Sequence, residues 1–167
     1  MPIRPRAHHA VARKAAAKSQ VLLKNDHGAL PVRGRKDVYV AGSNADNIGN
    51  QAGGWTLTWQ GGSTNVIPGT TILDGIRELA RGSVTHSEDA SAPIPKNPTG
   101  IVVVGETPYS EGFGDVGGPR WGFDPGDNGV LRPVKDMQLS AADKAAVDKR
   151  SAPRRSGAPW WSSPADR

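Results

Sequence analysis

The segment from Ile101 to Asp115, IVVVGETPYSEGFGD, constrains the fold of this chain more than any other. It begins with four apolar residues that run directly into a glycine. A short apolar run that ends in turn residues is typical of a strand buried on both faces, the kind found in parallel sheets. Ligands of open α/β sheets bind just beyond the carboxyl ends of such strands. The loop that follows carries Glu106, Glu111 and Asp115, so it is a candidate site.

Apolar spacing and capping residues predict helices and strands along the rest of the chain. Thr70 or Thr71 can cap a helix whose apolar residues recur at helical spacing, and Ser140 can cap a later helix with Asp143 at its third position. Strands and helices joined by short links indicate an α/β fold, here a partial three-layer αβα sandwich with a mostly parallel sheet. Helices are predicted over 8–18, 70–81 and 139–149, and strands over 37–42, 83–86 and 101–104.

The two ends of the chain differ from its middle. Residues 150–167 alternate Arg, Ser, Pro and Ala without periodicity, and such a segment cannot bury a core, so we expect a disordered C-terminal tail. We therefore divide the chain into an N-terminal helix and linker at 1–24, an incomplete sandwich domain at 25–149 and the tail at 150–167.

The charge distribution argues against several kinds of partner. Residues 1–24 carry six Lys/Arg and no acidic residue, and residues 149–167 carry five Lys/Arg and one Asp, so within a net charge of +5 the middle of the chain is net −5. An acidic middle without a known binding motif argues against nucleic acid, and a basic-tailed nucleic-acid binder is only the third hypothesis. No apolar run reaches the roughly 18–20 residues of a membrane span, and no signal peptide is visible. The cellular compartment is not indicated.

No metal site and no cofactor are predicted. The chain contains no Cys, which excludes thiolate ligands and disulfides. The histidines His8, His9, His27 and His86 lack metal-ligand spacing, which is typical of histidines at the surface or at helix ends. The glycine-rich segments lack both the phosphate-loop and the dinucleotide fingerprints.

Trp55 and Trp59 lie four residues apart in the segment GGWTLTWQGG. Aromatic faces on a loop can bind the apolar face of a sugar ring by stacking and by burial of area. The alternative is that both tryptophans are core residues under a loop. Their spacing alone does not decide between the two.

Glu106 and Glu111 are the two glutamates of the loop after the apolar run. Hydrolysis of a glycosidic bond needs one protonated carboxyl group that donates to the leaving oxygen and one carboxylate at the anomeric carbon. The two glutamates are five residues apart and need not share a face, so two solvated loop carboxylates are the alternative. Asp115 can orient one of them or cap a turn.

Four colinear segments together resemble the second domain of the family 3 glycoside hydrolases, the β-glucosidases and exo-β-glucan glucohydrolases. The combination of GGWTxxWQG with GExPYxExxGD is the most specific part of this resemblance. The segments are AVARKAAAKSQVLLKN (10–25), AGSNADNIGNQAGGWTLTWQG (41–61), GTTILDGI (69–76) and VVVGETPYSEGFGD (102–115).

The resemblance implies a role for each candidate residue. In the family, a barrel domain carries an aspartate nucleophile, and a six-stranded αβα sandwich contributes the general acid/base. The acid/base is the second glutamate of GExPYxE, which matches Glu111. The tryptophan pair flanks the glucosyl subsite, which matches Trp55 and Trp59. Supporting roles are then left for Glu106 and Asp115.

Two departures from the family pattern affect the expected activity. No residue here matches the nucleophile, and the helix at 140–149 is not followed by the family's next strand. We therefore interpret the chain as a fragment of a retaining β-glucosidase or exo-β-glucanase, inactive alone. Its expected partners are a β-glucoside or β-glucan oligosaccharide and the barrel domain of the parent enzyme. A non-catalytic carbohydrate-binding or accessory module is the alternative.

Overall fold

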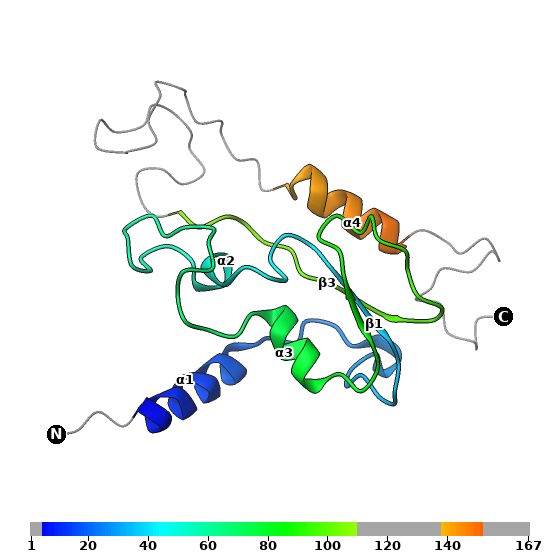
Figure 1. Ribbon diagram of the computed structural model, residues 1–167, viewed down its shortest axis with the longest axis horizontal. Coiled ribbons are helices and arrows are strands. Elements are labelled where there is room, and N and C mark those ends of the chain that lie inside the picture. Colours follow the sequence, from blue (N-terminus) through cyan, green and yellow to red (C-terminus); the bar gives the residue numbers. More distant parts are fainter. Residues whose placement is uncertain (1–4, 110–137, 152–167) are drawn as a thin grey trace. The chain divides into compact units, whose positions relative to one another are not determined.

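The computed structural model of this 167-residue chain describes residues 5–109 and 138–151 (Figure 1). The chain divides into two compact units, Met1–Arg33 and Gly34–Arg167. The first unit contains helix α1 (Pro5–Ser19) and the short 3-10 helix η1 (Asp26–Gly28). The Ala-rich sequence of α1 favours a helix, and the prediction of a helix here is confirmed.

A three-stranded parallel sheet forms the centre of the second unit, with the strand order β2-β1-β3. In the register of the ladders, Val40 of β1 lies opposite His86 of β2 and Ile101 of β3. The prediction of an α/β fold with a mostly parallel sheet is confirmed. The elements of this unit are β1 (Val38–Ala41), α2 (Ile48–Ala52), α3 (Ile72–Leu79), β2 (Val84–His86), β3 (Thr99–Val102) and α4 (Ala141–Ser151).

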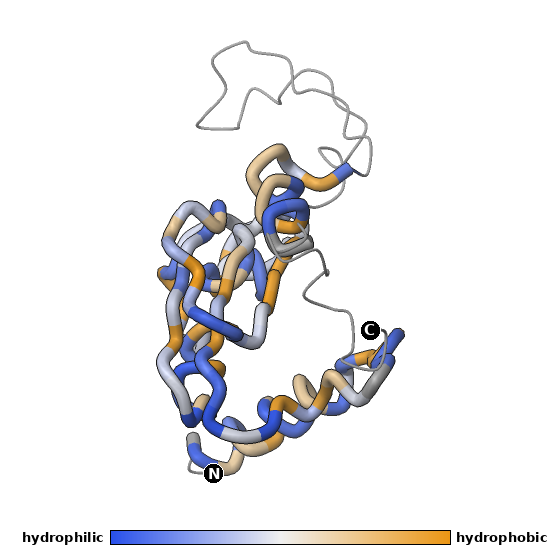
Figure 2. The backbone as a smooth tube through the Cα atoms, turned by 90° about the vertical axis from the view of Figure 1, so that its right-hand side faces the viewer, coloured by the Kyte–Doolittle hydropathy of each residue, from blue (hydrophilic) through white to orange (hydrophobic). Residues whose placement is uncertain are grey.

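Alternate residues of β1 contribute to two separate cores. Val38 and Val40 pack with Leu73 of α3, whereas Tyr39 packs with Ala146 of α4. Successive side chains of a strand point to opposite faces, so the two helices cover opposite sides of the sheet, as Figure 1 shows. This is the predicted three-layer arrangement. Figure 2 shows hydrophobic stretches of the chain separated by hydrophilic links.

The most buried strand is β1 and not β3. All four residues of β1 are buried, whereas those of β3 are half-buried and Val104 is 37% exposed. The run from Ile101 does pack on both faces, with Ile101 and Val103 against one core and Val102 against the other, but it is less buried than predicted. The reason is that β3 has a neighbouring strand on one side only within the described part of the chain.

Two of the helices begin at the predicted caps. Thr71 Oγ1 accepts a hydrogen bond from Asp74 N at 3.1 Å before α3, and Ser140 Oγ accepts one from Asp143 N at 3.1 Å before α4. Helix α4 continues to Ser151, so it enters the predicted tail. The remainder of that tail, residues 152–167, lies outside the described residues.

Helix α2 was not predicted. Its five residues, IGNQA, are too few and too polar to show a helical repeat. The N-cap is Asn47, whose side chain accepts a hydrogen bond from Asn50 N at 2.9 Å. This short helix connects β1 to the segment that carries the tryptophans.

Asp143 joins α4 to the loop after β1. Its side chain is 1% exposed, and Oδ1 accepts a hydrogen bond from Ser43 N at 2.8 Å. Its Oδ2 accepts from Ser43 Oγ at 2.8 Å and from Ser140 Oγ at 3.0 Å. A buried carboxyl group is tolerated where its oxygens accept several hydrogen bonds. Polar contacts therefore hold α4 against the sheet in addition to its apolar packing.

The boundaries expected from the sequence, after residues 24 and 149, stay predictions. In the part of the chain that the structure describes, no helix is long and apolar enough to cross a membrane.

We predict that Asp143→Asn destabilises the chain by about 2–3 kcal/mol, because the amide nitrogen cannot accept the hydrogen bonds that the carboxyl oxygens accept. Asp148→Asn is the matched control, since Asp148 lies on the same helix and is exposed. It should change the free energy of unfolding by less than about 0.5 kcal/mol. Urea denaturation followed by circular dichroism measures both values, and equal effects would contradict the structural role of Asp143.

Candidate functional site

The carboxyl ends of β1 and β3 lie side by side, and the helices that follow these strands lie on opposite faces of the sheet. A ligand crevice of open α/β sheets forms at such a point. Two loops are close to this edge. We call residues 53–62, which follow α2, the tryptophan loop, and residues 105–109, which follow β3, the glutamate loop.

The tryptophan loop closes on itself. Trp55 N donates a hydrogen bond to Trp59 O at 3.0 Å, and the two ring centroids are 6.1 Å apart with planes tilted by 48°. Trp55 is 70% exposed and Trp59 is half-buried. The alternative that both are core residues is therefore wrong for Trp55, because the short loop carries its side chain away from both cores.

Two residues of the tryptophan loop have an unusual backbone conformation. Trp55 has φ 62° and Leu57 has φ 61°, in the left-handed region that side chains with a Cβ rarely occupy. Such conformations persist only where the surrounding structure enforces them, and they are frequent at ligand sites. Both residues are largely exposed, so the strained backbone presents their side chains to solvent.

Close backbone packing joins the two loops. Gly61 has φ 71°, and a Cβ at this position would lie 2.9 Å from Pro108 Cβ and 2.5 Å from Gly53 O. A Cβ at Gly105 would collide with the side-chain amide of Asn44. The Gly61 position therefore requires glycine, because its φ is positive and the collision involves backbone, and Gly105 lies against the side chain of Asn44. The two loops are held against each other and against the segment after β1.

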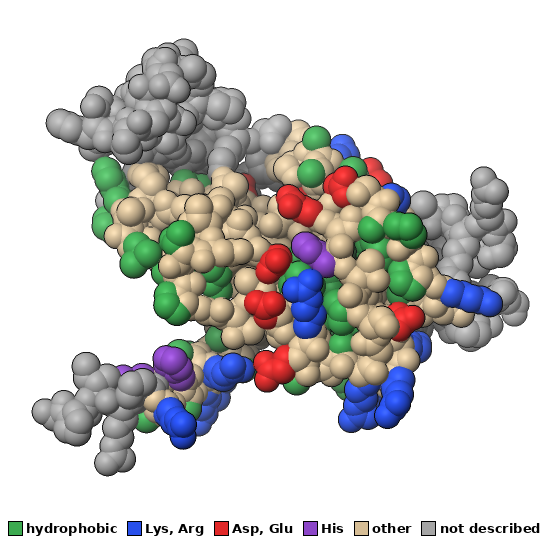
Figure 3. Space-filling model, in the orientation of Figure 1, with side chains coloured by type: hydrophobic (Ala, Val, Ile, Leu, Met, Phe, Trp, Pro, Cys, Tyr) green, Lys and Arg blue, Asp and Glu red, His purple; other side chains and the backbone are tan. Residues whose placement is uncertain are grey.

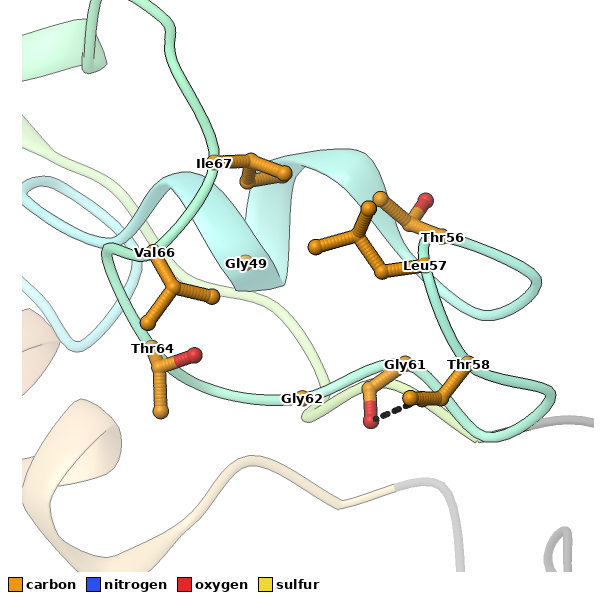
Figure 4. Close-up of a pocket in the computed structure, with 9 residues that line it drawn as sticks. All are labelled: Gly49, Thr56, Leu57, Thr58, Gly61, Gly62, Thr64, Val66 and Ile67. Atoms are coloured by element: carbon orange, nitrogen blue, oxygen red, sulfur yellow. Dashed lines mark hydrogen bonds between the residues drawn. The ribbon is translucent and has the colours of Figure 1, made fainter.

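A small pocket lies beside the tryptophan loop, with a volume of about 110 Å³ (Figure 4). Leu57, Val66 and Ile67 line it with apolar atoms, and Gly49 of α2 lies at its side. Thr58 Oγ1 donates a hydrogen bond to Gly61 O at 3.2 Å and stabilises the turn. The tryptophans do not line this pocket, which lies between residues 56–58 and residues 64–67.

A larger and more polar pocket, of about 260 Å³, lies at the carboxyl ends of all three strands. We call it the polar edge pocket. Carboxylate side chains and a histidine are visible near the middle of one face in Figure 3. The residues of the polar edge pocket that bear on its chemistry are Ser43, Asp46, Asn50, His86, Glu88 and Thr107.

His86 was predicted to lie at the surface or at a helix end, and this was wrong. It is the last residue of β2 and is half-buried, because the strand ends where the pocket begins. His8 and His9 lie on α1 and are exposed, as predicted. Within residues 5–109 and 138–151, no three His, Asp or Glu side chains converge as a metal site.

The predicted site residues are only partly within the described chain. Glu106 is exposed on the glutamate loop, whose Pro108 contacts Gly61 of the tryptophan loop. Glu111 and Asp115 lie outside the described residues. The sequence analysis missed Asp46, Asn50 and Glu88. The position of Asp46 and Glu88 soon after strand ends was a signal that could have found them, whereas Asn50 lies on α2, which the sequence did not predict.

Asp89 has a lowered pKa in the turn after β2. Hydrogen bonds from Ser91 are the main cause, and a further one comes from Ser87. A carboxyl group whose pKa is lowered on folding stabilises the fold above its unfolded pKa, and this contribution is lost as the pH falls through the lowered value. Asp89 does not line the polar edge pocket, so this shift concerns the turn and not the chemistry of the site.

Known proteins resemble this chain in sequence and in fold. The lysosomal beta glucosidase of Dictyostelium discoideum is 32% identical over an alignment that covers 60% of this chain and 15% of the relative. The exo-1,3/1,4-beta-glucanase of a Pseudoalteromonas species is similar in two crystal structures. The structure of a glutamine-to-alanine mutant has a TM-score of 0.60 and is 41% identical over 66% of this chain. A second structure has a TM-score of 0.58 and is 35% identical over 74% of this chain.

The chain spans less than a fifth of the length of each of these relatives, namely 15%, 18% and 16%. The sequence profile of the glycosyl hydrolase family 3 C-terminal domain matches residues 20–154. This match covers most of the chain, including all three strands of the sheet and both loops at its carboxyl edge. The chain therefore belongs to glycosyl hydrolase family 3 and carries the C-terminal domain of that family.

Proposed function

We propose that this chain supplies the general acid/base and the sugar-stacking tryptophans of a retaining β-glucosidase or exo-β-glucanase, which hydrolyses terminal β-D-glucosyl residues. The observation that carries the proposal is the contact between the two loops. Gly61 of the tryptophan loop packs on Pro108 of the glutamate loop, so the aromatic surface and the start of the catalytic motif lie together at one edge of the sheet.

Trp59 and Trp55 form the sugar-stacking surface in this proposal. An aromatic ring presented to solvent binds the apolar face of a glucosyl ring by removing both surfaces from water. Trp55 is 70% exposed, and Trp59 is half-buried beside it, with an inter-ring distance of 6.1 Å. The half-buried ring is the better positioned anchor, because its orientation is restrained by the surrounding loop.

Glu111 acts as the general acid/base. It is the second glutamate of the motif GETPYSE, two residues beyond the described glutamate loop. In the first step it protonates the leaving glycosidic oxygen, and in the second step it deprotonates the water that releases glucose. Glu106 and Asp115 support the loop around it.

The nucleophile comes from the barrel domain of the parent enzyme. A retaining mechanism needs two carboxyl groups roughly 5–5.5 Å apart on the two sides of the scissile bond. The chain offers one matching carboxyl group, so the other belongs to a second domain that packs at the carboxyl edge of the sheet. A β-glucoside or β-glucan oligosaccharide then binds between the two domains.

A non-catalytic carbohydrate-binding or accessory module is the second candidate. The observation that favours it is the high exposure of Trp55 on a loop with an enforced backbone conformation. This surface can bind a glucan without any chemistry. The two candidates differ in whether Glu111 affects the rate of a reaction.

We predict that the isolated chain does not hydrolyse an aryl β-glucoside above the uncatalysed background, because both steps require the absent nucleophile. Release of the aryl group, followed by absorbance, measures this. Turnover that disappears in Glu111→Gln would contradict the prediction. Adding the parent's barrel domain to the chain should restore turnover, and Glu111→Gln should then reduce it.

We predict that Trp59→Ala weakens binding of a β-glucan oligosaccharide by about tenfold or more, because the stacking surface is removed. Leu57→Ala is the matched control, since it truncates an exposed apolar side chain of the same loop that has no aromatic face. Isothermal titration calorimetry measures both affinities. An equal loss in the two variants would assign the effect to the loop conformation.

A further inference from the structure

We propose that the polar edge pocket binds one pyranose unit of the glucan, as a second sugar subsite beside the tryptophan loop. This inference rests on the proposed function and names a further binding site for the same substrate class. The pocket measures about 260 Å³, slightly below the ~300–1,000 Å³ of typical small-molecule sites, which suits a single small ring.

The chemistry of the lining favours a neutral, hydroxyl-rich ligand. Among the described residues that line it, the side chains are carboxylates, hydroxyls, amides and one imidazole, with no Lys, Arg, Phe, Tyr or Trp. Hydroxyls and amides donate hydrogen bonds, whereas carboxylates accept them. A phosphate would need cationic partners and a metal ion would need acceptors alone. A sugar, whose hydroxyls both donate and accept, matches the mixed set.

Two buried polar atoms in this lining have no hydrogen-bond partner among the described residues. They are Asn50 Oδ1 and His86 Nε2. Buried polar atoms in folded proteins are nearly always satisfied, and leaving one unsatisfied is costly. A sugar hydroxyl can donate to Asn50 Oδ1, and another can bond to His86 Nε2.

The orientation of the Asn50 amide is fixed from the other side. Its Nδ2 donates a hydrogen bond to Asn44 Oδ1 at 2.8 Å. Asn44 N in turn donates to Val103 O at 3.2 Å. Because the network holds the amide, the oxygen cannot rotate to find another partner, and a ligand hydroxyl can satisfy it in place.

The polar edge pocket adjoins both loops of the proposed active site. Ser63 follows the tryptophan loop, Thr107 belongs to the glutamate loop, and both line the pocket. A glucan that stacks on Trp59 therefore meets this pocket as a neighbouring binding surface. Asp46 and Glu88 also line the pocket and can accept hydrogen bonds from adjacent hydroxyls of the same ring.

Nuclear magnetic resonance on the isotopically labelled full chain tests the proposal. The probes are methyl β-D-glucopyranoside and a β-linked glucose disaccharide, titrated up to their solubility limits. The side-chain signals of Asn50 and His86 report the pocket, and the indole N–H signals of Trp55 and Trp59 report the stacking surface. We expect saturable shifts of both sets with the disaccharide.

Two variants test whether the pocket itself is the binding site. His86→Phe removes the orphaned nitrogen and keeps a ring, and Glu88→Gln removes the charge of an acceptor without changing its shape. Each should weaken the binding seen at the Asn50 signal by about three- to tenfold. Glu78→Gln, an exposed carboxylate on α3 outside the pocket, is the matched control and should leave binding unchanged. Equal effects of Glu88→Gln and Glu78→Gln would overturn the proposal.

The two sets of signals separate this inference from the proposed function. Shifts of the indole signals with unchanged Asn50 and His86 signals would overturn the pocket and leave the stacking surface intact. Shifts of Asn50 and His86 alone would support the pocket and count against the tryptophans. Unchanged signals throughout would overturn the proposal that the pocket binds a sugar. A titration with millimolar guanidinium in place of the sugars tests for a cation site. A saturable response of the Asn50 and His86 signals to guanidinium would also overturn the proposal.

Discussion

The burial of β1 is the constraint on which the rest of the second unit depends. Its four residues are buried and pair with strands on both sides, and their side chains alternate between the core under α3 and the core under α4. The loop that leaves this strand is equally constrained. Ser43 is bonded to Asp143 of α4, and Asn44 is bonded to Val103 and Asn50. Any shift of β1 would therefore move both loops of the site.

The glutamate and tryptophan loops place complementary surfaces at one edge of the sheet. As proposed, the aromatic surface would offer area and shape to a sugar ring, and the polar edge pocket would offer directional hydrogen bonds. In the proposed function neither surface performs the reaction alone, because a retaining mechanism requires carboxyl groups on opposite sides of the scissile bond.

Local signals predicted the regular elements well. Thr71 and Ser140 begin their helices as expected, since a capping hydrogen bond depends on residues only three positions apart. The apolar run predicted a strand over 101–104, and the structure has one at Thr99–Val102. The run overestimated the burial, because burial depends on which strands lie alongside. Helix α2 was missed for a similar reason. Its stability comes from the Asn47 cap and from contacts with distant residues, such as the hydrogen bond from Ile48 N to Asn65.

The sequence by itself determined the α/β class, the positions of most helices and strands, the family and the two motifs with Trp55, Trp59, Glu106, Glu111 and Asp115. Only the tertiary structure decided that the tryptophan loop packs on the glutamate loop and that Asp46, Asn50, His86 and Glu88 share one pocket. The physical reason is distance along the chain. Periodicity and capping act between near neighbours, whereas Gly61 meets Pro108 and Asp143 meets Ser43 only after the parallel sheet has brought its carboxyl ends together.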